Sequence, residues 1–184
     1  MKTKKSPMGQ YIIEGMGEVH EDIYFDPRHY VGEMLPLIGE ITVIFNALES
    51  DLDGYLCNEF SDRSDHKGLL VMHSMSYSQK VELYKRIRAE QIRIYSWDHL
   101  QFDKVISDLK ECAQLRNQVV HANWHHTDAE GYTHIKFKIS KDGLEHQLVQ
   151  FTTESLNSIL TKIDLTRTVL CFTEDEIKSR LLKE

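Results

Sequence analysis

The sequence predicts a mainly α-helical bundle with one inserted β-hairpin. Over most of the chain, apolar residues recur every three or four positions, which is the spacing of one face of a helix. In residues 131–151, by contrast, apolar and polar residues alternate, as they do in a half-buried strand. The length of 184 residues suits a single domain. We therefore expect an irregular N-terminal arm over residues 1–28 and one domain over residues 29–184.

The first long helix is predicted over residues 30–60. Its apolar residues keep the i, i+3, i+4, i+7 spacing for about eight turns. They are Met34, Leu37, Ile38, Ile41, Ile44, Phe45, Leu48, Leu52, Tyr55 and Leu56. Pro36 lies early in this stretch, where it marks either a first turn or a kink. The polar residues 61–68 predict a linker after the helix.

A second helix is predicted over about residues 78–94, with Val81, Tyr84 and Ile87 on its apolar side. Its other faces carry basic residues, namely Lys80, Lys85, Arg86, Arg88 and Arg93. These residues form either a solvated face or a patch for RNA phosphates or an acidic partner. On the second interpretation, Lys80, Arg86 and Arg88 are candidate contacts with an RNA substrate.

The third helix is predicted to begin near Asp98, because Asp98 and Gln101 have the spacing of a capping box. Its apolar residues keep the helical period as far as Trp124. On a helical wheel, Arg116 falls near the centre of this apolar stripe, where a charge is least expected. A buried guanidinium needs a partner. The partner is either a carboxylate such as Glu40 or Glu49, or an anion in a cleft or subunit interface.

The chain then changes to the period of a strand and back to that of a helix. Ile135, Phe137 and Ile139 alternate with polar residues, and Asp142-Gly143 predicts a hairpin turn before a return strand over 144–151. A fourth long helix follows. Thr173 and Glu176 have the spacing of a capping box, which predicts a short, separate C-terminal helix.

The segment 115–121, Leu-Arg-Asn-Gln-Val-Val-His, resembles the signature of the HEPN superfamily of helical domains, many of which are metal-independent RNases of toxin–antitoxin and antiviral systems. The family pattern is an Arg, a polar residue and a His after four to six intervening residues. Arg116, Asn117 and His121 match it. The chain departs from one branch of the family at Asn123, where HEPN partners of nucleotidyltransferase antitoxins carry a modifiable Tyr.

The resemblance implies an endoribonuclease with catalytic residues Arg116, Asn117 and His121, acting as a homodimer with RNA as its substrate and an antitoxin or regulatory protein as a partner. A guanidinium can bind phosphoryl oxygens as their charge grows, and a His can transfer protons near neutral pH. Trp124 and His125 are further candidate substrate contacts. The alternative is a non-catalytic HEPN-like dimeric module that binds a protein or RNA partner.

Neither a metal nor another cofactor is expected. His121 and His125 have an i, i+4 spacing, but no Glu lies beside His121 and no third ligand has a fixed spacing to them. The net charge of −7 argues against a protein that coats nucleic acid with a generally basic surface, but it is compatible with an enzyme that cleaves one phosphodiester in a local pocket.

The sequence also predicts a cytoplasmic protein without a membrane span. The apolar stretch behind the basic N-terminus is short and interrupted by Glu14, so a signal peptide is not expected. No apolar run approaches the roughly 20 residues of a transmembrane helix. The three separate residues Cys57, Cys112 and Cys171 are typical of reduced thiols.

Overall fold

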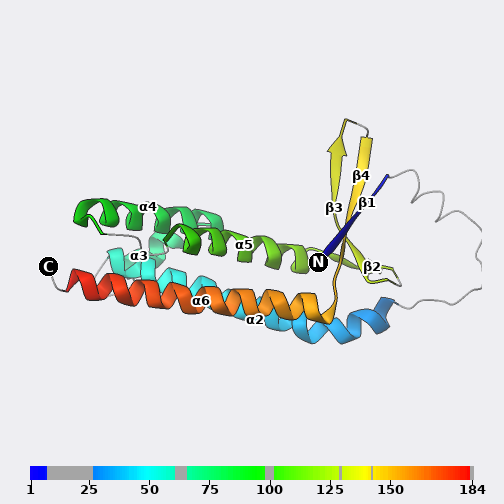
Figure 1. Ribbon diagram of the computed structural model, residues 1–184, viewed down its shortest axis with the longest axis horizontal. Helices are drawn as coiled ribbons and strands as arrows, with labels where there is room; N and C mark the ends of the chain where they lie inside the picture. Colours follow the sequence, from blue (N-terminus) through cyan, green and yellow to red (C-terminus); the bar gives the residue numbers. More distant parts are fainter. Residues whose placement is uncertain (8–26, 61–65, 98–101, 129, 142, 183–184) are drawn as a thin grey trace, which may run out of the picture. The chain divides into compact units, whose positions relative to one another are not determined.

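A computed structural model describes residues 1–7, 27–60, 66–97, 102–128, 130–141 and 143–182 of the chain. The described helices are α2 (Pro27–Phe60), α3 (His66–Met72), α4 (Tyr77–Tyr95), α5 (Phe102–Val120) and α6 (Thr153–Leu181). The described strands are β1 (Lys2–Pro7), β2 (Asn123–Thr127), β3 (Tyr132–Ser140) and β4 (Gly143–Gln150) (Figure 1). The predicted fold class, a helical bundle with a hairpin between its third and fourth long helices, is confirmed.

The chain forms two compact units. The sheet unit comprises Met1–Glu40 and Asn117–Ser158, and the helical unit comprises Ile41–Arg116 and Ile159–Glu184. The predicted capping box of Asp98 and Gln101 lies outside the described residues. The single domain expected over residues 29–184 stays a prediction.

The core of the helical unit is built from one face of each long helix. Its buried apolar residues recur at helical spacing, which is why the amphipathic pattern places these helices well. They include Ile41, Phe45, Leu48, Leu52, Leu56, Val81, Tyr84, Val105, Leu109, Ile163, Leu170 and Ile177. Helix α4 begins at a complete capping box, in which Ser76 and Gln79 satisfy each other's backbone N–H groups.

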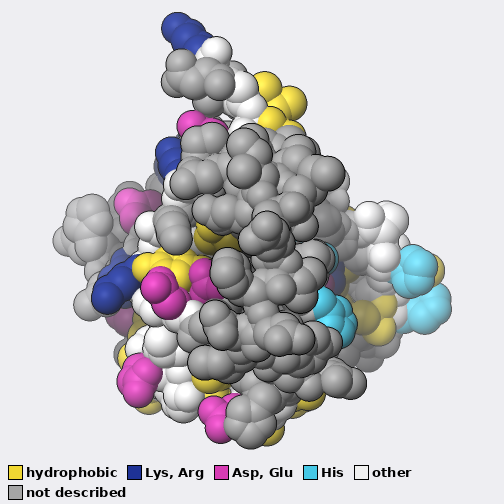
Figure 2. Space-filling model, turned by 90° about the vertical axis from the view of Figure 1, so that its right-hand side faces the viewer, with side chains coloured by type: hydrophobic (Ala, Val, Ile, Leu, Met, Phe, Trp, Pro, Cys, Tyr) yellow, Lys and Arg dark blue, Asp and Glu magenta, His cyan; other side chains and the backbone are white. Residues whose placement is uncertain are grey.

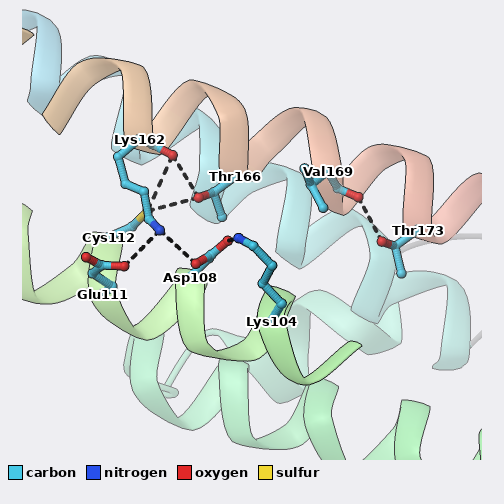
Figure 3. A network of polar contacts seen from close by, with 8 residues as sticks. All are labelled: Lys104, Asp108, Glu111, Cys112, Lys162, Thr166, Val169 and Thr173. Atoms are coloured by element: carbon cyan, nitrogen blue, oxygen red, sulfur yellow. Dashed lines mark hydrogen bonds and ion pairs between the residues drawn. The ribbon is translucent and has the colours of Figure 1, made fainter. Parts of the chain in front are cut away.

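Polar contacts join α5 to α6 within the helical unit (Figure 3). The ammonium group of Lys162 lies 2.7 Å from Asp108 and 2.8 Å from Glu111. Asp108 also accepts a hydrogen bond from Lys104. Burial opposes the ionisation of Asp108, but the hydrogen bonds from Lys104 and Lys162 outweigh it and hold the pKa of this carboxyl below its usual value.

A short helix replaces part of the predicted linker. Residues 66–68 belong to α3, while residues 61–65 lie outside the described residues. Gly68 is buried in α3, and a Cβ atom at this position would lie 2.8 Å from both Cα and Sγ of Cys57. Such a distance leaves no room for a side chain, so this helix can pack against α2 only through a glycine.

The predicted separate C-terminal helix is absent, because α6 continues from Thr153 to Leu181. Thr173 lies within α6, where its hydroxyl donates a 2.8 Å hydrogen bond to the carbonyl oxygen of Val169 (Figure 3). A Thr inside a helix can bond in this way to the carbonyl four residues earlier, so the Thr-x-x-Glu pattern alone does not fix a helix start.

The sheet is larger than the predicted hairpin. Its antiparallel strands have the order β1-β4-β3-β2. Residues 2–7 of the expected irregular arm therefore form an edge strand, paired with β4 from Lys2↔Gln150 to Pro7↔Glu145. The hairpin itself is confirmed, with Ser140 paired to Gly143 across the turn and Gly143 at a φ of 115°.

The alternation of β3 is interrupted at Ile135. The register with β4 shifts there, so that His134 pairs with Leu148 and Lys136 with Gln147. This β-bulge brings His134 and Phe137 to the same face of the strand, although they are three residues apart. Their ring centroids lie 4.5 Å apart.

Among the described helices, α2 has one segment, Val31–Phe60, that is long and apolar enough to cross a membrane by length and composition. The sequence had predicted a protein without a membrane span. A mostly buried core helix and a signal sequence both have these properties; 22% of the apolar window in α2 is buried, and α2 contributes residues to the core of the helical unit. Its Glu49 and Asp53 also bind the ammonium group of Lys80, each at 2.8 Å. The cytoplasmic location stays a prediction.

The three cysteines have different environments. All are free thiols, and Cys57 and Cys112 are buried while Cys171 is exposed. Burial raises the pKa of Cys112, whose Sγ lies 3.4 Å from the hydroxyl of Thr166.

Candidate functional site at the end of helix α5

Helix α5 ends at Val120, and the chain enters β2 at Asn123. The backbone N–H of His121 donates a 3.0 Å hydrogen bond to the carbonyl oxygen of Asn117, which completes the last helical turn. Asn117 and His121 are therefore one turn apart, a spacing at which side chains lie on the same side of a helix. Both side chains are exposed. This end of α5 in the sheet unit is the candidate site.

Trp124 lies on β2 and not, as predicted, on the third helix, and His125 follows it on the same strand. The indole N–H of Trp124 donates a 2.9 Å hydrogen bond to the carbonyl oxygen of Val119. Its ring also packs against Phe151, with centroids 4.9 Å apart. Trp124 thus ties the start of β2 back to the last turn of α5. His125 is exposed on the strand.

A second set of contacts fixes the turn between β2 and β3. The hydroxyl of Thr127 lies 2.9 Å from that of the buried Thr133. The carboxylate of Asp128 accepts hydrogen bonds from the backbone N–H groups of Glu130 and Tyr132, at 3.0 and 2.8 Å. Because Asp side chains stabilise turns in this way, the chain after His121 is held in a defined path.

Arg116 is the last residue of the helical unit. Its side chain is half-buried, and its Cζ lies 5.3 Å from the centroid of the Phe45 ring. This distance suits a cation–π interaction, and Arg is the most frequent cation in such pairs. Phe45 is one of the apolar residues of the predicted stripe on α2. Its ring therefore contacts the guanidinium of Arg116, the charge that the helical wheel predicted among apolar side chains. Of the two carboxylates considered as partners, that of Glu49 binds Lys80.

Two of the three predicted basic contacts on α4 lie in the core. Lys80 is 7% exposed and Arg88 is 3% exposed. Lys80 is bound by Glu49 and Asp53, and Arg88 by Glu59 and Glu174. Their charges are thus compensated by carboxylates within the protein. Both interpretations of these two residues, a solvated face and a patch for phosphates, are therefore wrong. Arg86, the third, is exposed and lines a shallow hollow with Ser78 and Glu82.

Another hollow lies between α2 and α6 in the helical unit. Asp51, Tyr55, Arg167 and Cys171 are among its lining residues. The guanidinium of Arg167 is held by Asp51 at 2.9 Å, so its main charge is already paired. No signal in the sequence pointed to this hollow.

Among the described residues, no three His, Cys, Asp or Glu side chains are grouped so that they could hold a metal ion. The i, i+4 spacing of His121 and His125 does not place them on one helix face, because α5 ends at Val120, before both residues, and His125 lies on β2. The expectation that no cofactor is needed stays a prediction.

Fold and site together define a mainly helical protein with a four-stranded sheet next to the end of its third long helix. Comparisons with models of protein families, with curated protein sequences and with solved structures found no match.

Proposed function

We propose that this protein is a metal-independent endoribonuclease of HEPN type, with Arg116, Asn117 and His121 as its catalytic residues. The observation that carries the proposal is the exposure of Asn117 and His121 one turn apart at the end of α5, within the Arg-Asn-x-x-x-His motif. A proton-transfer group must reach the substrate, and an exposed imidazole at a helix end meets that requirement. The helical bundle is also the fold that the resemblance implies.

The proposed chemistry needs three functions from these residues. His121 removes the proton of a 2′-hydroxyl or supplies one to the leaving 5′-oxygen, because an imidazole nitrogen can accept a proton and donate it again. Arg116 binds the phosphoryl oxygens and stabilises the charge that builds on them. Asn117 orients His121 or donates a hydrogen bond to the phosphate. Attack by the 2′-oxygen on phosphorus forms a 2′,3′-cyclic phosphate and releases a 5′-hydroxyl end.

The biological setting is part of the same proposal. The protein acts as a toxin or antiviral defence component in the cytoplasm, and an antitoxin or regulatory protein restrains it. It forms a homodimer, for which light scattering at micromolar concentration should return about twice the chain mass of 21.5 kDa. A monomer at that concentration would contradict the dimeric arrangement.

The test is cleavage of mixed RNA by the purified protein in EDTA. The His121→Ala variant should lose about 10²–10⁴-fold in rate, as is usual for an acid–base group. His73→Ala is the matched control, because His73 is also exposed but lies outside the sheet unit. Products should end in 2′,3′-cyclic phosphate. Equal cleavage by wild type and His121→Ala would exclude the catalytic role, and RNA binding without cleavage would favour the non-catalytic module.

A further inference from the structure

The sheet carries a positive charge in an otherwise acidic protein. Its four strands contain the five lysines Lys2, Lys4, Lys5, Lys136 and Lys138 and a single acidic residue, Glu145, which gives the strands a formal charge of +4. The whole chain has a net charge of −7. The strands therefore have a local excess of positive charge within an acidic chain, and such an excess attracts an anionic partner.

Two of these lysines lie in one row across the sheet. Lys5 of β1 pairs with Gln147 of β4, and Gln147 pairs with Lys136 of β3. Paired residues point to the same face, and neighbouring strands lie about 4.8 Å apart, so Lys5 and Lys136 start about 10 Å from each other. Both side chains are exposed. The row thus presents two accessible cations on one face.

The other face of the same hairpin presents aromatic and apolar groups. The β-bulge at Ile135 places His134 beside Phe137, and the Phe137 side chain remains 54% exposed. Ile139, two residues further on, is 85% exposed. In Figure 2, Lys or Arg side chains (dark blue) and hydrophobic side chains (yellow) occur together at the top of the view, where Figure 1 shows the turn between β3 and β4.

The two faces meet along one edge of the sheet. Strand β2 pairs with β3 only at Thr133 and His134, so among the described residues β3 is an edge strand from Lys136 onwards. A chain that crosses the first face from Lys5 to Lys136 and then turns over this edge can reach Phe137 on the other face. Single-stranded nucleic acid offers phosphates to cations and bases to aromatic rings, which is the combination that single-strand-binding surfaces use.

We propose that the β1-β4-β3 sheet docks single-stranded RNA, with phosphates at Lys5 and Lys136 and a base on the Phe137 ring. The inference rests on the proposed endoribonuclease function, because His121 belongs to the same sheet unit and the docked strand is its substrate. The docking surface holds the RNA, and His121 with its neighbours acts on it. An acidic protein segment would use the lysines but would gain little from an exposed aromatic ring.

Binding is measured by fluorescence anisotropy with an end-labelled single-stranded RNA of about 12 nucleotides. All proteins carry His121→Ala, and the RNA carries 2′-O-methyl groups in place of its nucleophilic 2′-hydroxyls, so that it stays intact whether or not His121 is catalytic. Lys5→Gln/Lys136→Gln should weaken binding and lower the slope of log K against log salt by about 1.4, which is two phosphate contacts at about 0.7 each. Lys67→Gln/Lys178→Gln is the matched control, because these exposed lysines lie in the helical unit and outside the basic residues of α4. An equal loss in both double variants, or none in the first, would overturn the proposal.

Phe137 supplies a second, independent readout. Phe137→Ala should weaken binding roughly 5- to 150-fold, as expected for the loss of one stacked base. Phe137→Tyr keeps the ring and should restore binding, which separates stacking from damage to the hairpin. Unchanged affinity in Phe137→Ala would overturn the stacking contact, as would a loss that Phe137→Tyr shares.

Three competitors identify the partner class. An excess of unlabelled single-stranded RNA should displace the label, while a polyglutamate peptide and vesicles of anionic lipid at equal negative charge should not. Displacement by the peptide or the vesicles alone would overturn the RNA assignment. If the RNA binds as expected but the His121→Ala variant cleaves RNA as fast as the wild type, the catalytic proposal fails and the docking proposal stands.

Discussion

Arg88 and Glu174, 86 residues apart in the chain, form a two-point ion pair in the helical unit: Nε of Arg88 lies 2.9 Å from Oε1 of Glu174, and its Nη2 contacts Oε2. Their side chains are 4% and 1% exposed. The hydroxyl of Tyr84 donates to the same carboxylate. Burial disfavours the charged guanidinium, but Glu174 and Glu59 outweigh it and raise the pKa of Arg88.

Breaking this pair should destabilise the protein strongly. Glu174→Ala leaves the guanidinium of Arg88 with its largest compensating charge removed, and we expect the free energy of unfolding to fall by roughly 3–5 kcal/mol. Arg88→Met/Glu174→Leu removes both charges and should recover most of that loss. Arg93→Ala is the control, because its pair with Glu90 is exposed and should contribute at most about 1 kcal/mol. Urea denaturation measures the free energy of unfolding of each variant. If the double variant were no more stable than Glu174→Ala, the interpretation would be contradicted.

Gly68→Ala should destabilise the helical unit by roughly 1–3 kcal/mol, because the added Cβ would lie 2.8 Å from Cα of Cys57, an atom that cannot move independently. Gly54→Ala is the matched control in α2. A Cβ at Gly54 would meet nothing within 4 Å, so the better helix former should stabilise the protein by about 0.4–1 kcal/mol. Thermal or chemical denaturation of both variants measures the change in the free energy of unfolding, which should be negative for Gly68→Ala and positive for Gly54→Ala. A stabilised Gly68→Ala protein would contradict the close approach.

Asp108 should make stability depend on acid pH. Its folded pKa lies below the unfolded value of about 3.9, so its contribution to stability is present above that pH and is lost as the pH falls through the folded pKa. The difference in free energy of unfolding between wild type and Asp108→Asn should therefore shrink below about pH 4. Denaturation at a series of pH values measures it, and parallel curves for the two proteins would exclude this linkage.

Arg116→Lys should impair cleavage more than folding. Lysine keeps the positive charge but lacks the planar, bidentate fork that binds two phosphoryl oxygens. We expect a loss of about 10²–10³-fold in the rate of RNA cleavage. The free energy of unfolding should change by about 1 kcal/mol or less, since the cation–π contact with Phe45 is within the reach of either cation. An unfolding loss above about 3 kcal/mol would instead assign Arg116 a structural role.

The sequence predicted the elements whose signal is local. The first two long helices were expected over residues 30–60 and 78–94, and they occupy Pro27–Phe60 and Tyr77–Tyr95. Their apolar residues recur at helical spacing over many turns, which is enough to predict where these helices lie. The hairpin was predicted in the same way from the adjacent residues Asp142 and Gly143, and the structure pairs Ser140 with Gly143, while Asp142 lies outside the described residues.

The elements that the sequence did not predict depend on distant partners. Strand β1 has a lysine-rich sequence of low intrinsic preference for strands, and its pairing with β4 stabilises it. The end of α5 lacks a Gly or Pro signal, and Trp124 happens to continue the helical phase, so the change to β2 is invisible along the chain. The bulge at Ile135 is likewise a property of the pairing.

The candidate site shows the same division. The end of α5 was found because Arg116, Asn117 and His121 lie close together in the sequence. Lys80 and Arg88 were assigned to an accessible face, because their carboxylate partners are 27 to 86 residues away. The lysines of the sheet were passed over for the same reason, since β1 and β3 are brought together only through β4.

The unequal exposure of the three cysteines makes the protein suitable for site-specific labelling. A maleimide dye should react with the exposed Cys171 while Cys57 and Cys112 are shielded by the folded core. The native chain thus accepts a single reporter in the helical unit without any engineered cysteine. Global unfolding would then be visible as the reaction of two further thiols, a chemical count that needs no optical probe.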